Sequence, residues 1–382
     1  MADVVDVGKN IQRLREIGDI SQSELALNSG LSRAAINAIE SGESSPRLET
    51  LARIAAALRV GLDDLMRPSK QRRRIRFRSD RRLTTRREII ARVSRVLDVF
   101  DELETKLGIY KGAAALDRLR AAVPASGANL DAGPQLAAET RQIMGLDPHE
   151  PIADLSGVLE RNGIRVLAAS VATDGFFGLS AADDVPAIAV NTWDRISVER
   201  RIFSAVHELG HLIADADDYD VDQMDEDKPT ETRADRFASY FLMPENAFKA
   251  AWAASAGLSL MDRTIKVKRI FRVSYKTVLM RVSDELGGDR GVWPAFYREQ
   301  KRRSGQSLPK TVEVQPLPDE AFSTTRRAEE PDPLSNTDFM DGRMFALAHQ
   351  AVNEHKITRG RATELLRIEL KDFNDRADGW CA

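Results

Sequence analysis

The sequence predicts a multidomain protein with an all-α N-terminal domain, a central α+β domain and a mostly α C-terminal region. Residues 1–68 carry apolar side chains at helical spacing between Gly and Pro breaks, whereas residues 134–257 combine helical periodicity with short strand-like runs. A polar stretch rich in Pro and charge, residues 301–336, separates the last helices from the rest. At 382 residues, 42% of them hydrophobic, the chain can form two or three domains.

We therefore divide the chain into five segments. Residues 1–68 form the first domain, residues 69–133 a basic linker and long helix, and residues 134–257 the central domain. Residues 258–290 form a second pair of helices, and residues 291–382 a linker with a helical end. The start shows no signal peptide, no apolar run reaches transmembrane length, and Cys381 is the single cysteine. These features predict a cytoplasmic protein with no membrane partner.

Two short helices in the first domain are joined by a tight turn. Ser21 with Glu24 three residues later is a capping-box pair that begins a helix, and Gly30 ends it. Ser32 begins the next helix, which ends at Gly42. This arrangement is a helix-turn-helix signature.

Residues 8–66 also resemble the Xre/Cro family of phage-repressor-like DNA-binding domains. The resemblance rests on Ser21-Gln22, Leu25-Ala26, Gly30-Leu31-Ser32, Ile36, Glu40, Gly42, Pro46 and Leu51. It implies a double-stranded DNA operator as partner, with Ser32, Arg33 and Asn37 on the second helix and Gln22 before them as contacts, and it allows a homodimer. The alternative is a helical bundle without a DNA role.

The charge is distributed unevenly around this domain. Residues 1–68 hold eight Lys/Arg against ten Asp/Glu, which gives little non-specific affinity for phosphate. Residues 69–95 hold twelve Lys/Arg and two Asp/Glu, so they could supply that affinity or form a basic face that pairs with acids elsewhere. Apolar spacing from Thr84 to Tyr110 predicts one long helix, and residues 111–133 are expected to be a loose connector.

The central domain is expected to run helix, helix, strands, helix. Residues 134–146 and 151–163 have helical patterns, residues 164–170 form a strand, and residues 176–191 form two strands around an acidic turn. The second of these strands, Ala187 to Val190, is a candidate for pairing with an extended substrate. A buried amphipathic helix follows from Arg200 to Ile213.

That helix carries a His-Glu-x-x-His motif. His207 and His211 lie one turn apart on one face, where two imidazoles can hold one Zn²⁺, and Glu208 beside them can act as general base. Glu231, in the first turn of the next predicted helix, is the candidate third ligand. Asp235, four residues later, could accept the outer proton of a ligand histidine. Small Gly210 is expected to face the site. An accidental motif, or a site that binds zinc without hydrolysis, are the alternatives.

The run from Asp154 to Glu245 resembles the ImmA/IrrE family of zincin metallopeptidases. The matching pieces are PIADLSGVLERNGIRV, FGLSA, IAVN, RRIFSAVHELGHLI and ETRADRFASYFLMP. The resemblance implies a zincin-like fold, zinc ligands at His207, His211 and Glu231, and Glu208 as general base. The family usually has Glu and Asn where this chain has Arg233 and Asp235, and we expect Arg233 to mark only a different surface.

Family members commonly cleave repressor-like DNA-binding proteins in stress or mobile-element control. The resemblance therefore implies a DNA-binding transcriptional regulator with a zinc-dependent endopeptidase domain and a repressor-like protein substrate. The alternative is a transcription factor or antitoxin-like regulator whose zincin domain senses a metal, ligand or partner without hydrolysis.

Four further hypotheses concern the flanking segments. Residues 215–227 contain eight acids but lack the Gly and Glu of a calcium loop, and they could fold against Arg72 to Arg74. The candidates for stabilising the oxyanion are Tyr219, Tyr240 and Tyr275.

Residues 258–287 resemble a second helix-turn-helix that either contacts DNA or packs beside the zincin. Its candidate DNA contacts are Arg272, Ser274, Tyr275, Lys276 and Arg281. The helices from Met344 to Phe373 either cap the fold or form a partner surface.

Overall fold

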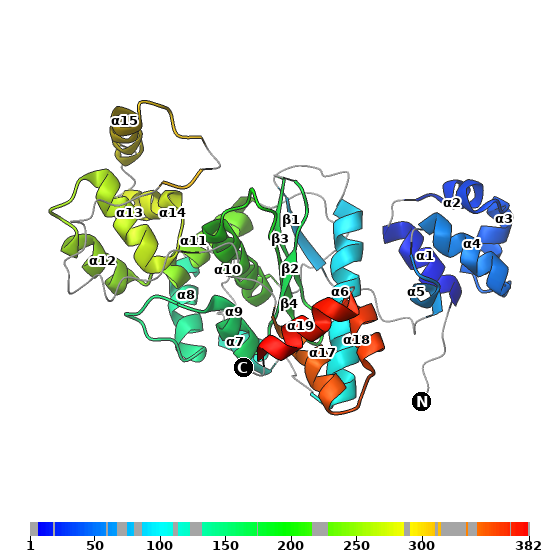
Figure 1. Cartoon of the computed structure of the whole chain (residues 1–382). Helices are drawn as coiled ribbons and strands as arrows, with labels where there is room; N and C mark the ends of the chain where they lie inside the picture. The colour runs from blue at the N-terminus through cyan, green and yellow to red at the C-terminus, as the bar shows by residue number, and fades with distance from the viewer. Residues whose placement is uncertain are drawn as a thin grey trace. The chain divides into compact units, whose positions relative to one another are not determined.

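The chain folds into two compact units. The computed structural model describes residues 7–17, 20–58, 60–66, 75–79, 86–109, 114–122, 132–173, 175–215, 228–285, 291–309, 312–314, 334, 342–366 and 368–380. One unit takes Met1–Arg73 and Arg82–Asp101, and the other takes Arg74–Arg81 and Glu102–Ala382. The predicted order of helical, mixed and helical regions is confirmed (Figure 1). None of the helices in the described ranges is long and apolar enough to cross a membrane.

Five short helices form the N-terminal bundle. They are α1 Val7–Ile17, α2 Gln22–Ser29, α3 Arg33–Glu40, α4 Leu48–Leu58 and α5 Leu62–Met66. Ser21 caps α2 by accepting a hydrogen bond from the Glu24 amide (3.1 Å), and Ser32 caps α3 in the same way through Ala35 (3.1 Å). Gly30 ends α2 in the left-handed region at φ 65°, where glycine is unstrained. These caps are the ones that the sequence predicts.

A buried carboxylate connects three of these helices. Glu40, at the end of α3, accepts hydrogen bonds from Arg15 Nε on α1 (2.6 Å) and from Gln22 Nε2 on α2 (2.9 Å). The bundle is otherwise closed by apolar side chains that lie below one tenth exposure, namely Ile11, Leu14, Leu25, Ala26, Ile36, Ile39, Leu51, Ile54, Ala55 and Leu65. These two partners offset part of the cost of burying the Glu40 carboxylate.

The segment between the bundle and the central domain contains more regular structure than the sequence analysis expects. The predicted long helix is present as α6, Arg86–Leu107. The expected loose connector at residues 111–133 is wrong, because α7 spans Ala114–Ala122 and α8, Ala132–Ile143, begins inside it. Leu116 and Leu119 are buried in the core of the second unit, which explains why this Ala-rich stretch is helical.

A four-stranded mixed sheet organises the second unit. Its strands are β1 Ile75–Ser79, β2 Arg165–Ala169, β3 Phe176–Ala181 and β4 Ala187–Asn191, in the order β1-β3-β4-β2. β4 pairs parallel with β2 and antiparallel with β3, and β1 pairs antiparallel with β3. The basic linker, for which the sequence predicts no strand, contributes the edge strand β1. The prediction that Ala187 to Val190 pairs with an extended substrate is wrong, because β4 is already paired on one side with β2 and on the other with β3.

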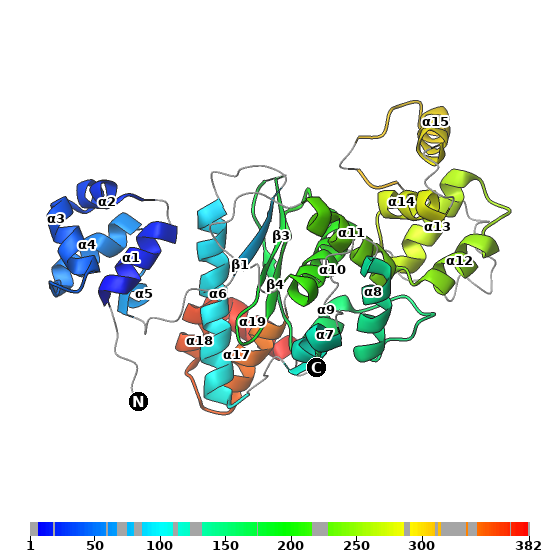
Figure 2. The ribbon, with the colours of Figure 1, turned by 180° about the vertical axis from the view of Figure 1, so that it is seen from behind.

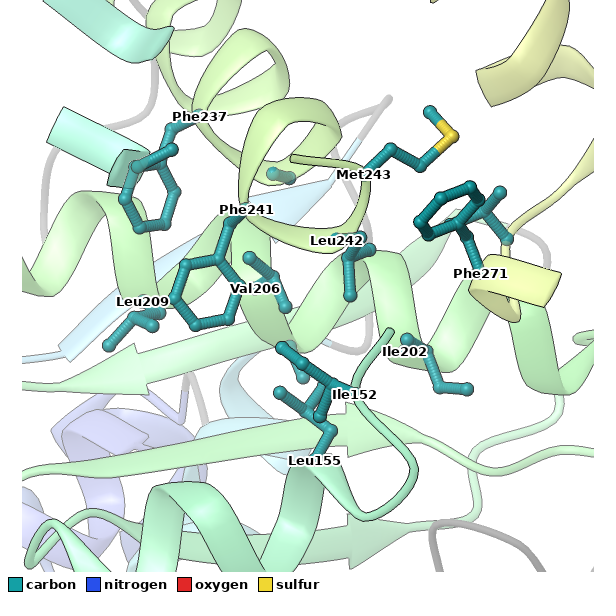
Figure 3. Packing of buried hydrophobic residues seen from close by; sticks show 14 of the residues in the cluster. Ile152, Leu155, Ile202, Val206, Leu209, Phe237, Phe241, Leu242, Met243 and Phe271 are labelled. Atoms are coloured by element: carbon teal, nitrogen blue, oxygen red, sulfur yellow. The ribbon is translucent and has the colours of Figure 1, made fainter. Parts of the chain in front are cut away.

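One face of the sheet is covered by helices. α10, Val198–Ala214, contacts β3 and β4 and packs on α11, Lys228–Leu242, which in turn packs on α8. The shared core lies between these helices, α9 (Leu155–Arg161) and the sheet (Figure 3). Arg141 of α8, whose pKa burial lowers to about 10, donates to the Phe241 carbonyl of α11 (2.8 Å).

Gly210 allows α10 and α11 to approach closely. A Cβ at this position would lie 2.9 Å from Cδ1 of Phe237, which is fully buried on α11. The expectation that Gly210 faces the metal site is therefore wrong, since its side faces the neighbouring helix. Its role is helix packing.

Four helices lie beyond α11 on the side away from the sheet, as both views show (Figures 1 and 2). They are α12 Glu245–Ala254, α13 Leu260–Phe271, α14 Tyr275–Glu285 and α15 Val292–Ser304. Residues 258–287 are predicted either to contact DNA or to pack beside the central domain. Tyr275 and Arg281 are buried, so these two side chains pack and do not contact DNA. Arg272 donates to the Ala153 carbonyl (2.7 Å), while Ser274 caps α14 through Thr277 (3.1 Å) and Lys276 is half-buried.

The C-terminal region is partly integrated with the second unit. Within the expected polar linker 301–336, α15 continues to Ser304, Glu313 pairs with buried Lys268 (3.0 Å), and Val314 joins the core. Helices α17 Arg343–Asn353, α18 Arg359–Leu366 and α19 Leu370–Trp380 follow. Arg343 pairs with Glu104 (3.0 Å) and Arg361 with Glu102 (3.0 Å) at the end of α6. These contacts attach the last helices to the same unit.

Candidate metal centre

Helix α10 presents both histidines from the core. Ser197 caps the helix through the Arg200 amide (3.3 Å), and apolar side chains then anchor it against the sheet and α11. His207 and His211 are almost completely buried, and their Nε2 atoms lie 3.0 Å apart. The one-turn spacing therefore directs both rings to a single point.

Helix α11 brings a carboxylate to the same point. Glu231 Oε2 lies 3.1 Å from His207 Nε2, and Oε1 lies 3.1 Å from His211 Nε2. Within the described residues, these three side chains form the group whose ligand atoms all lie within 4.8 Å of one another. Tetrahedral ligands about 2.0–2.1 Å from zinc lie roughly 3.3 Å apart, so this His₂Glu set fits a catalytic zinc site.

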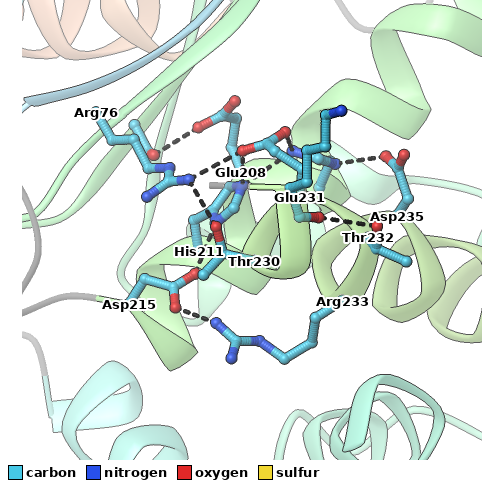
Figure 4. A network of polar contacts seen from close by, with 12 residues as sticks. Arg76, Glu208, His211, Asp215, Thr230, Glu231, Thr232, Arg233 and Asp235 are labelled. Carbon is cyan, nitrogen blue, oxygen red and sulfur yellow. Dashed lines mark hydrogen bonds and ion pairs between the residues drawn. The ribbon is translucent and has the colours of Figure 1, made fainter. Parts of the chain in front are cut away.

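The outer nitrogens of both histidines meet carboxylates, and Figure 4 shows His211 beside Asp215. His207 Nδ1 lies 2.8 Å from Asp235 Oδ1, and His211 Nδ1 lies 2.7 Å from Asp215 Oδ2. A carboxylate only accepts, so each Nδ1 that meets one carries a proton. With Nδ1 protonated, the Nε2 atom of a neutral histidine keeps the lone pair that would bind a cation. This is the tautomer that a metal ligand requires.

Two residues of this network were missed by the sequence analysis. Asp215 begins the acidic stretch, yet it also follows His211 by one helical turn, and that spacing is the signal in the sequence that identifies it. Arg233 was expected to mark only a different surface. It is instead buried and ion-paired with Asp215. The remainder of the acidic stretch, with Tyr219, lies outside the described residues, as do Arg72 to Arg74.

Electrostatics stabilise the charged forms of these groups. Burial alone would raise the pKa of Asp215, but His211 and Arg233 hold that pKa below its usual value. Burial would likewise raise the pKa of Glu231, but the two histidines hold it far below its usual value. Burial opposes the charged form of His211, while Asp215 and Glu231 raise its pKa. The site thus favours a cation between its carboxylates.

Glu208 lies beside the ligand set and is fully buried. Ser180 Oγ of β3 donates to its Oε2 (2.6 Å), and a Cβ at Gly178 would lie 3.4 Å from its Cγ. Among the atoms that the structure describes, Glu208 Oε1 is buried without a hydrogen-bond partner. Oε2 is therefore fixed by a hydrogen bond, whereas Oε1 accepts none from the described atoms. Ser180 was also missed, because nothing in the run FFGLSA distinguishes it from any other small strand residue.

Arg76 reaches the site from β1. Its Nη2 lies 2.9 Å from Glu231 Oε1 and 3.3 Å from Thr230 Oγ1. Burial opposes its charge, but the bond to Glu231 raises its pKa above the usual value. Of the two roles predicted for the basic linker, Arg76 therefore has the second, because it pairs with an acidic residue elsewhere in the chain. The sequence gives no signal that selects it from the neighbouring arginines.

The other candidates have different surroundings. Tyr275 is buried and stacks on Phe296 (5.2 Å between ring centroids), and Tyr240 lies against the Arg281 guanidinium (3.1 Å to the ring centroid). Both rings therefore pack the region of α11 to α15.

The candidate DNA contacts lie in the N-terminal bundle. Arg33 and Asn37 are exposed on α3, Ser32 Oγ caps that helix, and Gln22 Nε2 lies 3.4 Å from Asn37 Oδ1.

Comparison with known proteins agrees with both domains. Residues 159–283 match the peptidase M78 family, the IrrE N-terminal-like domain, and residues 11–65 match a helix-turn-helix family. The chain thus carries an Xre/Cro-type helix-turn-helix DNA-binding domain followed by an IrrE-like metallopeptidase-family domain, as the sequence resemblance predicts.

Matches over the whole chain are weak. No curated protein matches it significantly. The crystal structure of Bacillus thuringiensis PlcR in complex with the peptide PapR7 and DNA aligns with 99% of this chain and 98% of its own, at 10% identity and a TM-score of 0.18. A score this low carries no argument about the fold or function of this chain.

Proposed function

We propose that this protein is a cytoplasmic DNA-binding regulator whose central domain is a zinc-dependent endopeptidase. In this proposal His207, His211 and Glu231 hold Zn²⁺, and Asp235 and Asp215 fix the two histidines. The domain would cleave a repressor-like protein and so control stress or mobile-element genes. The convergence of His207, His211 and Glu231 next to Glu208 supports this proposal most strongly.

The chemistry divides between the ion and the chain. Zinc held by this set would lower the pKa of a water molecule and polarise a peptide carbonyl. Glu208 would accept the proton of the attacking water on Oε1 and pass it to the leaving amine, while Ser180 holds Oε2 in place. The peptide C–N bond breaks, the water oxygen becomes part of the new carboxylate, and the proton carried by Glu208 goes to the leaving amine.

A direct test compares the wild type with Glu208→Gln. Each full-length protein is incubated with zinc and the helix-turn-helix repressors of its host, and cleavage is followed by mass spectrometry. We expect cleavage by the wild type and a loss of at least about 100-fold in the variant, the minimum for removal of a general base. Equal cleavage by both proteins would refute the role of Glu208.

A second candidate is a regulator whose zincin domain senses metal, ligand or partner without hydrolysis. It is favoured by one observation: β1 already covers the β3 edge beside Glu208. A sensor requires no general base. If neither protein cleaves any candidate, but zinc changes the DNA affinity of wild type and Glu208→Gln equally, this second function replaces the first.

A further inference from the structure

Strand β1 does not belong to the matched metallopeptidase-family domain. The match covers residues 159–283, which supply β2, β3 and β4, while β1 comes from the linker between α5 and α6. Without β1, the order β3-β4-β2 leaves β3 as an edge strand. An edge strand is a template on which an extended peptide can add by backbone hydrogen bonds. β1 occupies this edge as such a peptide would.

The edge in question runs past the proposed general base. On β3, Ser180 donates to Glu208 (2.6 Å) and Gly178 lies next to its side chain. In the antiparallel register, Arg76 is the partner of Ser180 and Arg78 is the partner of Gly178. The β1 backbone therefore lies alongside the two β3 residues that contact Glu208.

One β1 side chain enters the metal centre itself. Arg76 Nη2 lies 2.9 Å from Glu231 Oε1, and the side chain is only 17% exposed. In the same strand, Ile75 is buried at 1% exposure. The Glu231 carboxylate accepts a hydrogen bond from this guanidinium. It therefore favours an arginine at this position of a bound strand, by charge and by hydrogen-bond geometry.

We propose that β1 is an autoinhibitory segment: it occupies the β3 edge in place of an extended peptide, and Arg76, opposite Ser180, takes the position of an arginine in that peptide. The proposal deepens the proposed peptidase function and rests on it. Because a tethered ligand acts at millimolar effective concentration, β1 must leave before another peptide enters. Release of β1 thus controls access to the β3 edge.

Peptide binding tests this without hydrolysis. A fluorescent peptide of residues 73–81, RRIRFRSDR, is titrated against zinc-loaded full-length protein carrying Glu208→Gln, and anisotropy is measured. The same titration is made with Arg76→Ala added and, as a matched control, with Arg302→Ala, an exposed arginine of α15. We expect Arg76→Ala to bind the peptide at least tenfold more tightly than the parent, and Arg302→Ala to bind like the parent.

The arginine requirement is tested in the peptide. Replacing the arginine that corresponds to Arg76 with alanine should weaken binding to the Arg76→Ala chain at least tenfold. Equal affinity of parent and Arg76→Ala chains, or of the two peptides, would overturn the proposal.

Hydrogen exchange provides an independent measurement. Amides of 176–181 should exchange faster in Arg76→Ala and regain protection when the peptide is added, while circular dichroism reports whether the variant is folded. Arg76→Lys, which keeps the charge, serves if Arg76→Ala does not fold, and it should show the same effects more weakly. Protection unchanged by the substitution and by the peptide would contradict the proposal. If the wild type cleaves no repressor but the peptide binds as expected, the peptidase function fails and the occupation of the β3 edge by β1 stands.

Discussion

His211 has a carboxylate at each nitrogen, and its partners define what it can do. Asp215 accepts from Nδ1 at 2.7 Å, and Glu231 lies 3.1 Å from Nε2. Arg233 in turn pairs with Asp215, so the orientation of one ligand depends on a chain of three buried side chains. Outer partners of this kind raise the basicity of a ligand and fix its ring.

Asp215→Asn is expected to weaken zinc binding by about 10–100-fold, because an amide orients the imidazole less strongly than a carboxylate and does not form the ion pair that Asp215 makes with Arg233. Isothermal titration with a competing chelator measures the affinity. Asp284→Asn, at an exposed position of α14, is the matched control and should bind zinc like the wild type. Equal affinities in both variants would show that Asp215 does not position His211.

Asp262 is expected to contribute pH-dependent stability. Arg303 donates to both of its oxygens (2.7 and 2.8 Å), and this pairing holds the pKa of Asp262 below its usual value. A lowered carboxyl pKa stabilises the folded state above the unfolded pKa, about 3.9, and this contribution is lost as the pH falls through the folded pKa. Asp262→Asn should therefore be destabilised at pH 7 and approach the wild type at low pH.

Urea unfolding at pH 7 and near pH 3 measures this difference. Because Arg303 is partly exposed, we expect only about 1 kcal/mol at pH 7. A gap between wild type and variant that stays constant between the two pH values would contradict the assignment.

The contact between α10 and α11 makes Gly210 a sensitive position. Gly210→Ala adds a methyl group 2.9 Å from the fully buried Phe237 ring, so the helices must separate or the ring must move. Overpacking of this kind costs about 1–3 kcal/mol, partly offset by about 1 kcal/mol of improved helix propensity.

We therefore expect a net loss of stability and a lower Tm in thermal unfolding. Gly257→Ala is the control, since a Cβ there meets nothing within 4 Å. A Tm for Gly210→Ala equal to that of Gly257→Ala would mean that α11 adapts without cost.

At the scale of elements, local signals predicted the helices well and the sheet incompletely. Ser21, Ser32 and Gly30 act as helix caps and stops because capping is a local interaction. β1 was missed because its alternation of Ile75, Arg76 and Phe77 lies within a strongly basic run, and only pairing with β3 makes it a strand. The interior place of β4 was also unpredictable, since alternation does not reveal which strands pair.

The same distinction applies to the metal centre. His207, His211 and Glu231 could be placed from helical spacing and the resemblance, because each lies on a helix whose periodicity fixes its face. Arg76 and Ser180 come from strands far away in the sequence, and tertiary pairing alone brings them to Glu231 and Glu208. No local pattern encodes that pairing.

For the whole molecule, the DNA-binding domain and the metallopeptidase-family domain are joined through a segment that takes part in the second fold. The chain leaves the bundle after α5, forms β1 beside the candidate metal centre, and then forms α6. The proposed regulatory function therefore requires that His207, His211 and Glu231 bind zinc.

The most direct test of that claim is the zinc content of full-length protein by native mass spectrometry, with a chelator titration for affinity. We expect one zinc ion per wild-type chain. We expect the zinc affinity of Glu231→Gln to fall by more than the roughly 10–100-fold that removal of an outer hydrogen-bond partner causes. The control Glu364→Gln, an exposed carboxylate of α18, should match the wild type. Zinc bound equally by wild type and Glu231→Gln would contradict the His₂Glu centre.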